Sequence, residues 1–315
     1  ERTGKPDGFP ELFFIRAFMV KIFAGKITLI GTGKIISLGW PGESRQGIDI
    51  FSGICYNLSS DIPENKGRTM IYEIAGLRVL IKNKNLFTTR FCKGWISADQ
   101  NSLPDLCAEA TEEAMGEEKA VSPGYPDGYI ENICIYRDLC QQLPEYGRFL
   151  VHSAVLSYQN EGFAFLGRSG TGKTTHTGLW LRYLPGAEII NGDKPVFQKD
   201  GDIFYAFGTP WMGKESRGRN AKVPLKALCF LAQKKGNTIR RLTPKETSEK
   251  LMTQLLIPQD EKNAIATLEL ADSLISSVPA YLLECDISET AVRTSFEEMT
   301  GKDYENEKQS KGDLL

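Results

Sequence analysis

The sequence predicts a mixed α/β fold, with a central sheet flanked by helices and preceded by a smaller α+β domain. Short apolar strand patterns alternate with helical ones after Gly147. A glycine-rich stretch, Gly167–Thr174, separates a strand pattern from a helix pattern. The length of 315 residues corresponds to two domains at roughly 150 residues each.

The composition is that of an ordinary globular chain. Hydrophobic residues make up 41% and charged residues 25%, which excludes collagen-like, coiled-coil and wholly disordered proteins. The net charge of −2 provides no basic field, so we expect neither nucleic acid nor a membrane as partner. Charges interrupt the apolar stretch 12–30, which is too short for a membrane span. The alternative that residues 12–30 form a basic helix at a membrane surface stays open.

The cysteines and histidines limit the chemistry of the protein. Seven cysteines with no Cys-x-x-Cys pair and no visible secretory signal indicate reduced thiols in a cytoplasmic protein. We expect them to be small core residues. Two histidines, His152 and His176, are too few for a His-rich zinc site.

Residues 1–69 are predicted to be a non-native or disordered extension. Their apolar runs show no sustained period, whereas residues 71–81 have the alternation of a strand–turn–strand unit. We hypothesise that Met70 is the natural start of the chain. The alternative is a genuine, poorly packed N-terminal extension.

Residues 70–146 are predicted to form a small α+β domain without a recognisable catalytic constellation. It alternates short strand patterns with helical stretches, the first of them acidic. The predicted strands are Tyr72–Ile74, Arg78–Ile81 and Leu86–Arg90, and the predicted helices are Ala108–Lys119 and Tyr129–Leu143.

Residues 147–300 are predicted to form the α/β domain, and residues 301–315 a frayed tail. One helix covers Thr174–Leu184, another begins at Thr243 with a capping box, and a third runs from Asp286 to about Met299. The predicted strands are Phe149–Tyr158, Gly162–Leu166, Ala187–Asn191, Ile203–Phe207, Leu225–Ala232 and Ala280–Cys285.

The stretch Gly167–Thr174 satisfies the Walker A pattern G-x-x-x-x-G-K-[ST] of P-loop proteins. Its glycines allow backbone amides to point inward at a helix N-terminus, where they form an anion site. Lys173 would contact the β- and γ-phosphates, and Thr174 would bind Mg²⁺. The sequence therefore predicts binding of ATP or GTP with Mg²⁺. The predicted nucleotide-binding residues are Gly167, Ser169, Gly170, Thr171, Gly172, Lys173, Thr174 and Thr175.

Two further residues are candidates for proton transfer. Asp193 follows the predicted strand Ala187–Asn191, where a carboxylate can hold Mg²⁺ or take a proton from a phosphate acceptor. The alternative is a turn aspartate. His152 is either a satisfied core residue or a catalytic one. His176 can contact the nucleotide or Trp180, or pack on the surface.

A second loop follows the predicted strand Ile203–Phe207 and contains small residues, a proline and several cations. Lys214, Arg217 and Arg219 could clamp a phosphate or an acidic acceptor at this strand end. A solvated basic turn is the alternative.

Taken together, these motifs resemble the C-terminal kinase domain of HPr kinase/phosphorylase and its relatives, which include ATP-dependent phosphoenolpyruvate carboxykinase. The resemblance rests on His152–Val155, Gly170–Thr174 and Asn191–Asp193, and covers roughly residues 147–300. It implies a P-loop core of mixed β-sheet. The pattern from Ile71 onward also looks like small HPr-kinase-like proteins of anaerobic bacteria, some of whose relatives accompany peptide-modification systems.

The resemblance implies roles for individual residues. His152 matches the family's proton-transfer histidine, Lys173 and Thr174 match its phosphate and metal residues, and Asp193 matches an acidic residue at the next strand's end. One departure is that Lys194 stands where the family usually has a second acid. It leaves open whether metal binding and general-base work are separated and whether a reverse phosphorylase reaction exists.

The sequence therefore predicts an HPr-serine-kinase-like phosphotransferase. It would transfer the γ-phosphate of Mg-ATP to a hydroxyl, most simply Ser or Thr of a small protein or peptide. The alternatives are a nucleotide-binding switch protein, which hydrolyses nucleotide or only binds it, and a carboxykinase-like enzyme. The acceptor, the choice between ATP and GTP, and a homo-oligomeric state stay open.

Overall fold

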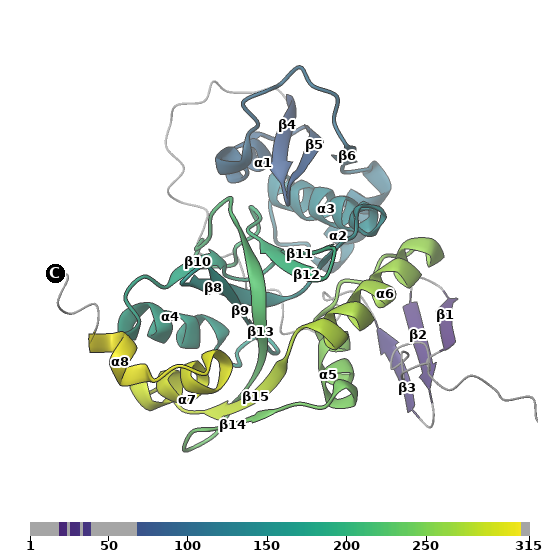
Figure 1. The fold of residues 1–315 in the computed structure, drawn as a ribbon. Helices are drawn as coiled ribbons and strands as arrows, with labels where there is room; N and C mark the ends of the chain where they lie inside the picture. The colour runs from purple at the N-terminus through teal and green to yellow at the C-terminus, as the bar shows by residue number, and fades with distance from the viewer. Residues whose placement is uncertain (1–18, 24–25, 32–33, 39–67, 310–315) are drawn as a thin grey trace, which may run out of the picture.

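The computed structural model describes residues 19–23, 26–31, 34–38 and 68–309 (Figure 1). The strands are β1 (Met19–Phe23), β2 (Lys26–Gly31), β3 (Lys34–Leu38), β4 (Arg68–Ile74), β5 (Leu77–Asn83), β6 (Leu106–Glu109), β7 (Arg148–Leu150), β8 (Ser153–Tyr158), β9 (Glu161–Leu166), β10 (Glu188–Asn191), β11 (Val196–Asp200), β12 (Ile203–Phe207), β13 (Lys222–Gln233), β14 (Thr238–Arg241) and β15 (Ala280–Cys285). The α-helices are α1 (Leu86–Phe91), α2 (Glu112–Val121), α3 (Asp127–Gln142), α4 (Lys173–Tyr183), α5 (Pro244–Leu251), α6 (Glu261–Ser277), α7 (Glu289–Thr300) and α8 (Tyr304–Gln309).

A curled mixed sheet of nine strands forms the centre of the molecule. Its main path runs β10-β8-β9-β13-β12-β11-β7, and β15 and β14 extend it from β13. Strand β13 connects two parts of the sheet, because its first residues pair antiparallel with β12 and its later ones pair parallel with β9 and β15. The prediction of an α/β fold with a mixed sheet and flanking helices is confirmed.

Helices cover both faces of this sheet, as the alternation along β9 shows. Phe163 and Phe165 pack against α4 and α7, in a cluster centred on Trp180. Ala164 and Leu166 belong to the opposite cluster, with buried residues of α6. Since neighbouring strand residues point to opposite faces, β9 is buried on both sides and lies at the centre of the fold.

The segment 70–146 forms a three-stranded sheet, β4-β5-β6, packed with α1, α2 and α3. Its hydrophobic cluster continues into residues 147–309, the larger part of the molecule, through Val196, Phe207 and Trp211. The two segments therefore share buried apolar surface.

Several predicted elements differ from the observed ones. The segment 86–90, predicted as a strand, is helix α1, because Phe87 packs edge-on against Tyr129 of α3 and tertiary contacts outweigh the strand propensity of its residues. The predicted helix 108–119 begins only at Glu112, after the N-cap Thr111, because its first residues pair with β5 in β6.

Two further differences concern the ends of predicted elements. The predicted strand 149–158 is interrupted at residues 151 and 152, where the chain leaves β11 and joins β9. The tail, predicted to be frayed from 301, contains α8, whose Tyr304 is 1% exposed and packs on Phe296. Strand β11 and helix α6 were not predicted.

Other expectations concern the helix starts and the terminal segments. The capping box of Thr243 and Glu246 is confirmed, and the third helix is capped by Ser288.

Strands β1–β3 form an antiparallel sheet within residues 1–69, most of which lie outside the described residues. Whether that segment is native stays a prediction. No helix in the described ranges is long and apolar enough to cross a membrane.

Candidate functional site

The phosphate loop, defined as Gly167–Thr174, connects the end of β9 to the start of α4. Gly170 and Gly172 have φ of 82° and 98°, a left-handed conformation that side chains with a Cβ rarely adopt. Gly172 is also the N-cap of α4. The glycines of the motif thus turn the chain directly into a helix N-terminus, which attracts anions.

Lys173 is buried within this loop, at 8% exposure. Its ammonium donates to the carbonyls of Gly167 at 2.8 Å and Arg168 at 3.4 Å. Within the described residues no carboxylate lies within ion-pair distance of it. Burial lowers the pKa of Lys173 to about 8, although nearby Asp193 acts in the opposite direction. A buried cation without an ion pair is a favourable site for an incoming anion.

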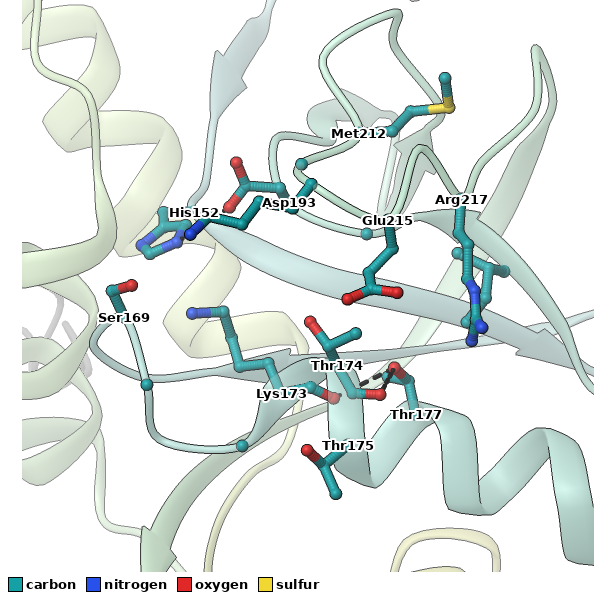
Figure 2. A pocket seen from close by; sticks show the side chains of 16 residues that line it. His152, Ser169, Lys173, Thr174, Thr175, Thr177, Asp193, Met212, Glu215 and Arg217 are labelled. Carbon is teal, nitrogen blue, oxygen red and sulfur yellow. Dashed lines mark hydrogen bonds and ion pairs between the residues drawn. The ribbon is translucent and has the colours of Figure 1, made fainter. Parts of the chain in front are cut away.

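A cavity of about 260 Å³ lies between the phosphate loop and the end of β10 (Figure 2). It brings together most of the predicted site residues. These are His152, Ser169, Gly170, Gly172, Lys173, Thr174, Thr175, Asp193, Lys214 and Arg217.

Three predicted residues do not line the cavity. Gly167 and Thr171 shape the phosphate loop, where the Thr171 hydroxyl donates to the Arg168 carbonyl at 2.9 Å. Arg219 forms an ion pair with Glu188 instead.

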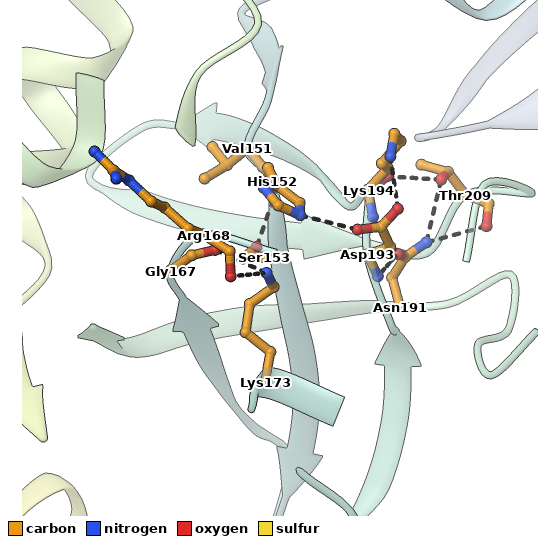
Figure 3. A network of polar contacts seen from close by, with 10 residues as sticks. All are labelled: Val151, His152, Ser153, Gly167, Arg168, Lys173, Asn191, Asp193, Lys194 and Thr209. Atoms are coloured by element: carbon orange, nitrogen blue, oxygen red, sulfur yellow. Dashed lines mark hydrogen bonds and ion pairs between the residues drawn. The ribbon is translucent and has the colours of Figure 1, made fainter. Parts of the chain in front are cut away.

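Asp193 and His152 face Lys173 from the opposite wall (Figure 2). His152 Nε2 lies 3.1 Å from Asp193 Oδ1, and Lys194 Nζ lies 2.6 Å from the other carboxylate oxygen (Figure 3). Burial lowers the pKa of His152, so its ring is neutral near pH 7 and Nε2–H is assigned as the donor. Burial would raise the pKa of Asp193, but Lys194 and His152 outweigh it and hold that pKa below its usual range.

The backbone of Asp193 is positioned by the buried side chain of Asn191, to which the sequence analysis assigned no role of its own. Asn191 Oδ1 accepts from the amides of Asp193 at 2.9 Å and Lys194 at 2.7 Å. Its Nδ2 donates to the carbonyl and hydroxyl oxygens of Thr209, both at 3.1 Å (Figure 3). The sequence signal was the Asn-Gly-Asp turn after a strand, which is typical of such side-chain caps.

A second loop covers the Asp193 side of the cavity, and we call Gly208–Asn220 the cavity loop. Its two ends lie close together, because a Cβ at Gly208 would lie 1.9 Å from the Arg219 carbonyl oxygen. It also packs closely on β10, because the same Cβ would lie 2.6 Å from the Ile190 carbonyl oxygen. Glu215 in this loop lines the cavity, and its carboxylate points toward the phosphate loop (Figure 2). Sequence reasoning weighed only the cations around it.

His176 lies outside the cavity lining. His176 is 3% exposed, so the prediction that it packs on the surface is wrong. The predicted contact with Trp180 is confirmed, because the indole N–H donates to His176 Nε2 at 3.2 Å. His176 Nε2 also lies 3.1 Å from the Ser295 hydroxyl of α7. Burial lowers the pKa of His176 to about 4. The residue therefore connects α4 to α7.

The donor set of the cavity fits Mg²⁺ bound together with phosphates. Magnesium in nucleotide sites takes one or two protein oxygens and completes its shell with phosphate and water. The hydroxyl of Thr174 and the carboxylate of Asp193 both line the cavity. No group of three or more His, Cys, Asp or Glu side chains that could hold a metal without nucleotide occurs in the described part of the chain.

No family model matches the sequence, and no curated protein matches it. Among solved structures, the HPr(Ser) kinase/phosphatase from Coxiella burnetii matches 48% of this chain and 97% of its own, at 11% identity and a TM-score of 0.27. The similarity is distant. At that TM-score it carries no argument about activity.

Proposed function

We propose that this protein is a Mg²⁺-dependent phosphotransferase that moves the γ-phosphate of ATP or GTP to a hydroxyl. The observation that carries the proposal is the buried Lys173 at the N-terminus of α4, facing the Asp193–His152 pair across one cavity. The acceptor is most simply a Ser or Thr of a small protein or peptide.

On the nucleotide side, the protein supplies positive charge. The N-terminus of α4 and the loop amides would bind the phosphate oxygens, and Lys173 would exchange its two carbonyl partners for the β- and γ-phosphates. Because the phosphoryl group carries negative charge throughout the transfer, fixed cations and amide dipoles stabilise the transition state without reorganising.

The residues that would hold the metal are Thr174 and Asp193, with Glu215 as a second carboxylate at the same cavity. When bound, Mg²⁺ neutralises charge on the β- and γ-phosphates. Glu215 would supply the acid that the chain lacks at position 194, where Lys194 pairs with Asp193 instead.

On the acceptor side, Asp193 and His152 would accept the proton of the acceptor hydroxyl. The acceptor oxygen forms a bond to the γ-phosphorus as the bond from that phosphorus to the β–γ bridging oxygen breaks, and the hydroxyl proton passes to the Asp193–His152 pair. The neutral ring of His152 has one nitrogen available as a base while Nε2–H is held by Asp193. Exposed Lys214 and Arg217 at the cavity would contact the acceptor.

One observation favours a second candidate, a nucleotide-binding switch. Asp193 contacts both Lys194 and His152, which makes its carboxylate a weak base. A switch would bind Mg-ATP through the same phosphate loop and would hydrolyse it slowly or not at all.

The test is transfer from γ-labelled ATP. The full-length protein is incubated with Mg²⁺ and a panel of Ser- and Thr-containing peptides and small proteins, and labelled products are located by mass spectrometry. We expect acceptor-dependent ADP release that Asp193→Asn removes. If ATP binds but no acceptor accelerates ADP release, the switch is favoured. If neither ATP nor GTP binds, both candidates fail.

A further inference from the structure

The cavity loop is attached at both ends to the segment 70–146, which lies far from it in the sequence. At its start, the indole N–H of Trp95 donates to the Gly208 carbonyl at 3.2 Å, and both groups are buried. At its end, Asn220 Nδ2 donates to the Glu73 carbonyl at 3.2 Å. Glu73 belongs to the edge of the β4-β5-β6 sheet.

The first third of the cavity loop is attached to the same segment by an aromatic contact as well. The ring of Trp211 lies 4.9 Å from that of Tyr136 on α3, centroid to centroid. Trp211 is 3% exposed and belongs to the hydrophobic cluster of the segment 70–146. The loop is therefore attached to this segment by two contacts in its first four residues and by one at its end.

The position of this loop matters for one wall of the cavity. A Cβ at Gly213 would lie 3.0 Å from the Cβ of Asp193, and one at Gly192 would lie 2.7 Å from the Met212 carbonyl oxygen. Such close packing means that a displaced loop changes the surroundings of Asp193 and moves Lys214, Glu215 and Arg217. These three are the charged residues of the loop that line the cavity.

The phosphate loop has a different set of contacts. In the described ranges its hydrogen bonds run within the loop, into α4 and to Gln233, whose amide donates to the Gly170 carbonyl at 3.0 Å. Gln233 belongs to β13, in the larger part of the molecule. The nucleotide wall is thus built without contributions from the segment 70–146.

We propose that the segment 70–146 is a scaffold that holds the cavity loop in place and so positions the acceptor wall of the site, separately from the nucleotide wall. Trp95, Tyr136 and the edge of β4 act as positioning groups. The role of this wall in binding an acceptor rests on the proposed function, whereas the attachment of the cavity loop to the segment 70–146 does not.

The test uses trypsin, because the loop contains exposed Lys214 and Arg217. Trp95→Phe keeps an aromatic side chain, although a smaller one, and removes the hydrogen bond to Gly208. We expect initial cleavage after Lys214 and Arg217 to rise about threefold or more, since the loss of one buried hydrogen bond increases the population of the open loop. Cleavage after exposed Lys235, in the turn between β13 and β14, should stay unchanged.

Two further variants keep the test decisive. Tyr146→Phe removes a hydrogen bond to the Asp105 carbonyl within the same segment, and we expect wild-type cleavage of the loop. Asn220→Ala removes the contact at the other end from an exposed position, and we expect faster cleavage after Lys214 and Arg217 even if Trp95→Phe does not fold.

Equal loop cleavage in wild type, Trp95→Phe and Asn220→Ala would overturn the scaffold role. A uniform rise in the rate of cleavage that includes Lys235 would overturn it too, because such a rise indicates global destabilisation.

Calorimetry with Mg-ATP separates the scaffold proposal from the proposed function. We expect the same affinity in Trp95→Phe as in wild type, and a selective loss of affinity in this variant would also contradict a separate nucleotide wall. A lack of both ATP and GTP binding in every form removes the proposed function and leaves the proteolysis result valid.

Discussion

The two loops that form the cavity are built in different ways. The phosphate loop is a run of consecutive residues whose hydrogen bonds are mostly local, between Lys173 and the carbonyls just before it. The cavity loop bonds to Asn191 and Glu188 in the neighbouring part of the chain. It also bonds to groups more than a hundred residues away, such as Trp95 for Gly208. The difference teaches that, in the proposed function, the nucleotide wall would be encoded locally, whereas the acceptor wall would also depend on contacts with the distant segment 70–146. The predictions below test this division, from the largest expected effect to the smallest.

Asp193→Asn tests the acceptor wall. It keeps the shape of the side chain and removes the charge that Lys194 and His152 contact. We expect phosphoryl transfer to fall about 100-fold, the usual size of a lost acid–base contribution. The measurement is the rate of labelled phosphate transfer at saturating ATP. Unchanged turnover would show that Asp193 has no role in proton transfer.

Lys173→Ala tests the nucleotide wall. We expect ATP affinity to weaken about 30-fold or more, because hydrogen bonds from a charged donor are worth roughly 2 kcal/mol. The measurement is the ATP-induced rise in melting temperature, which follows affinity by mass action. The matched control is Lys199→Ala, which removes an exposed lysine that donates to Ser273. An equal ATP-induced rise in both variants would contradict the assignment of Lys173.

The pH dependence of binding sharpens the same test. Burial lowers the pKa of Lys173 to about 8, so the free protein loses this charge as the pH rises from 7 to 9. Bound phosphate favours the ammonium form, so binding takes up a proton and affinity should fall about tenfold over this range. Calorimetry in buffers of different ionisation enthalpy measures the uptake. The dependence should disappear in Lys173→Met, and its persistence there would assign it to another group.

Glu215→Gln tests whether the two walls cooperate in metal binding. We expect Mn²⁺ affinity in the presence of ATP to fall up to about fivefold, as for an exposed charge worth at most about 1 kcal/mol. Affinity for ATP without metal should not change. The readout is free Mn²⁺ by electron paramagnetic resonance, and Glu298→Gln, on an exposed position of α7 outside the cavity lining, is the control. Equal Mn²⁺ binding in the two variants would exclude Glu215 as a metal ligand.

Sequence reasoning succeeded where the signal is local. The phosphate loop, the capping box at Thr243 and the strand β12 follow from a few adjacent residues, because backbone conformation there depends on glycine, caps and alternation. His152 and Asp193 were identified separately as candidates. Only the structure shows them in contact, 3.1 Å apart.

Sequence reasoning failed where tertiary packing decides. Helix α1 has residues that favour a strand, and packing on α3 outweighs that preference. Glu215 stands in a run of charged residues, and nothing local distinguishes a cavity-lining carboxylate from a solvated one. The attachment of the cavity loop through Trp95 could not be predicted, because no pattern relates residues 113 positions apart.

The most direct test of the central claim is calorimetry of the full-length protein with ATP, with and without Mg²⁺. We predict saturable binding of one nucleotide per chain that Mg²⁺ strengthens. Absence of saturable binding of both ATP and GTP at millimolar concentration, with Mg²⁺ present and the protein folded, would contradict the account.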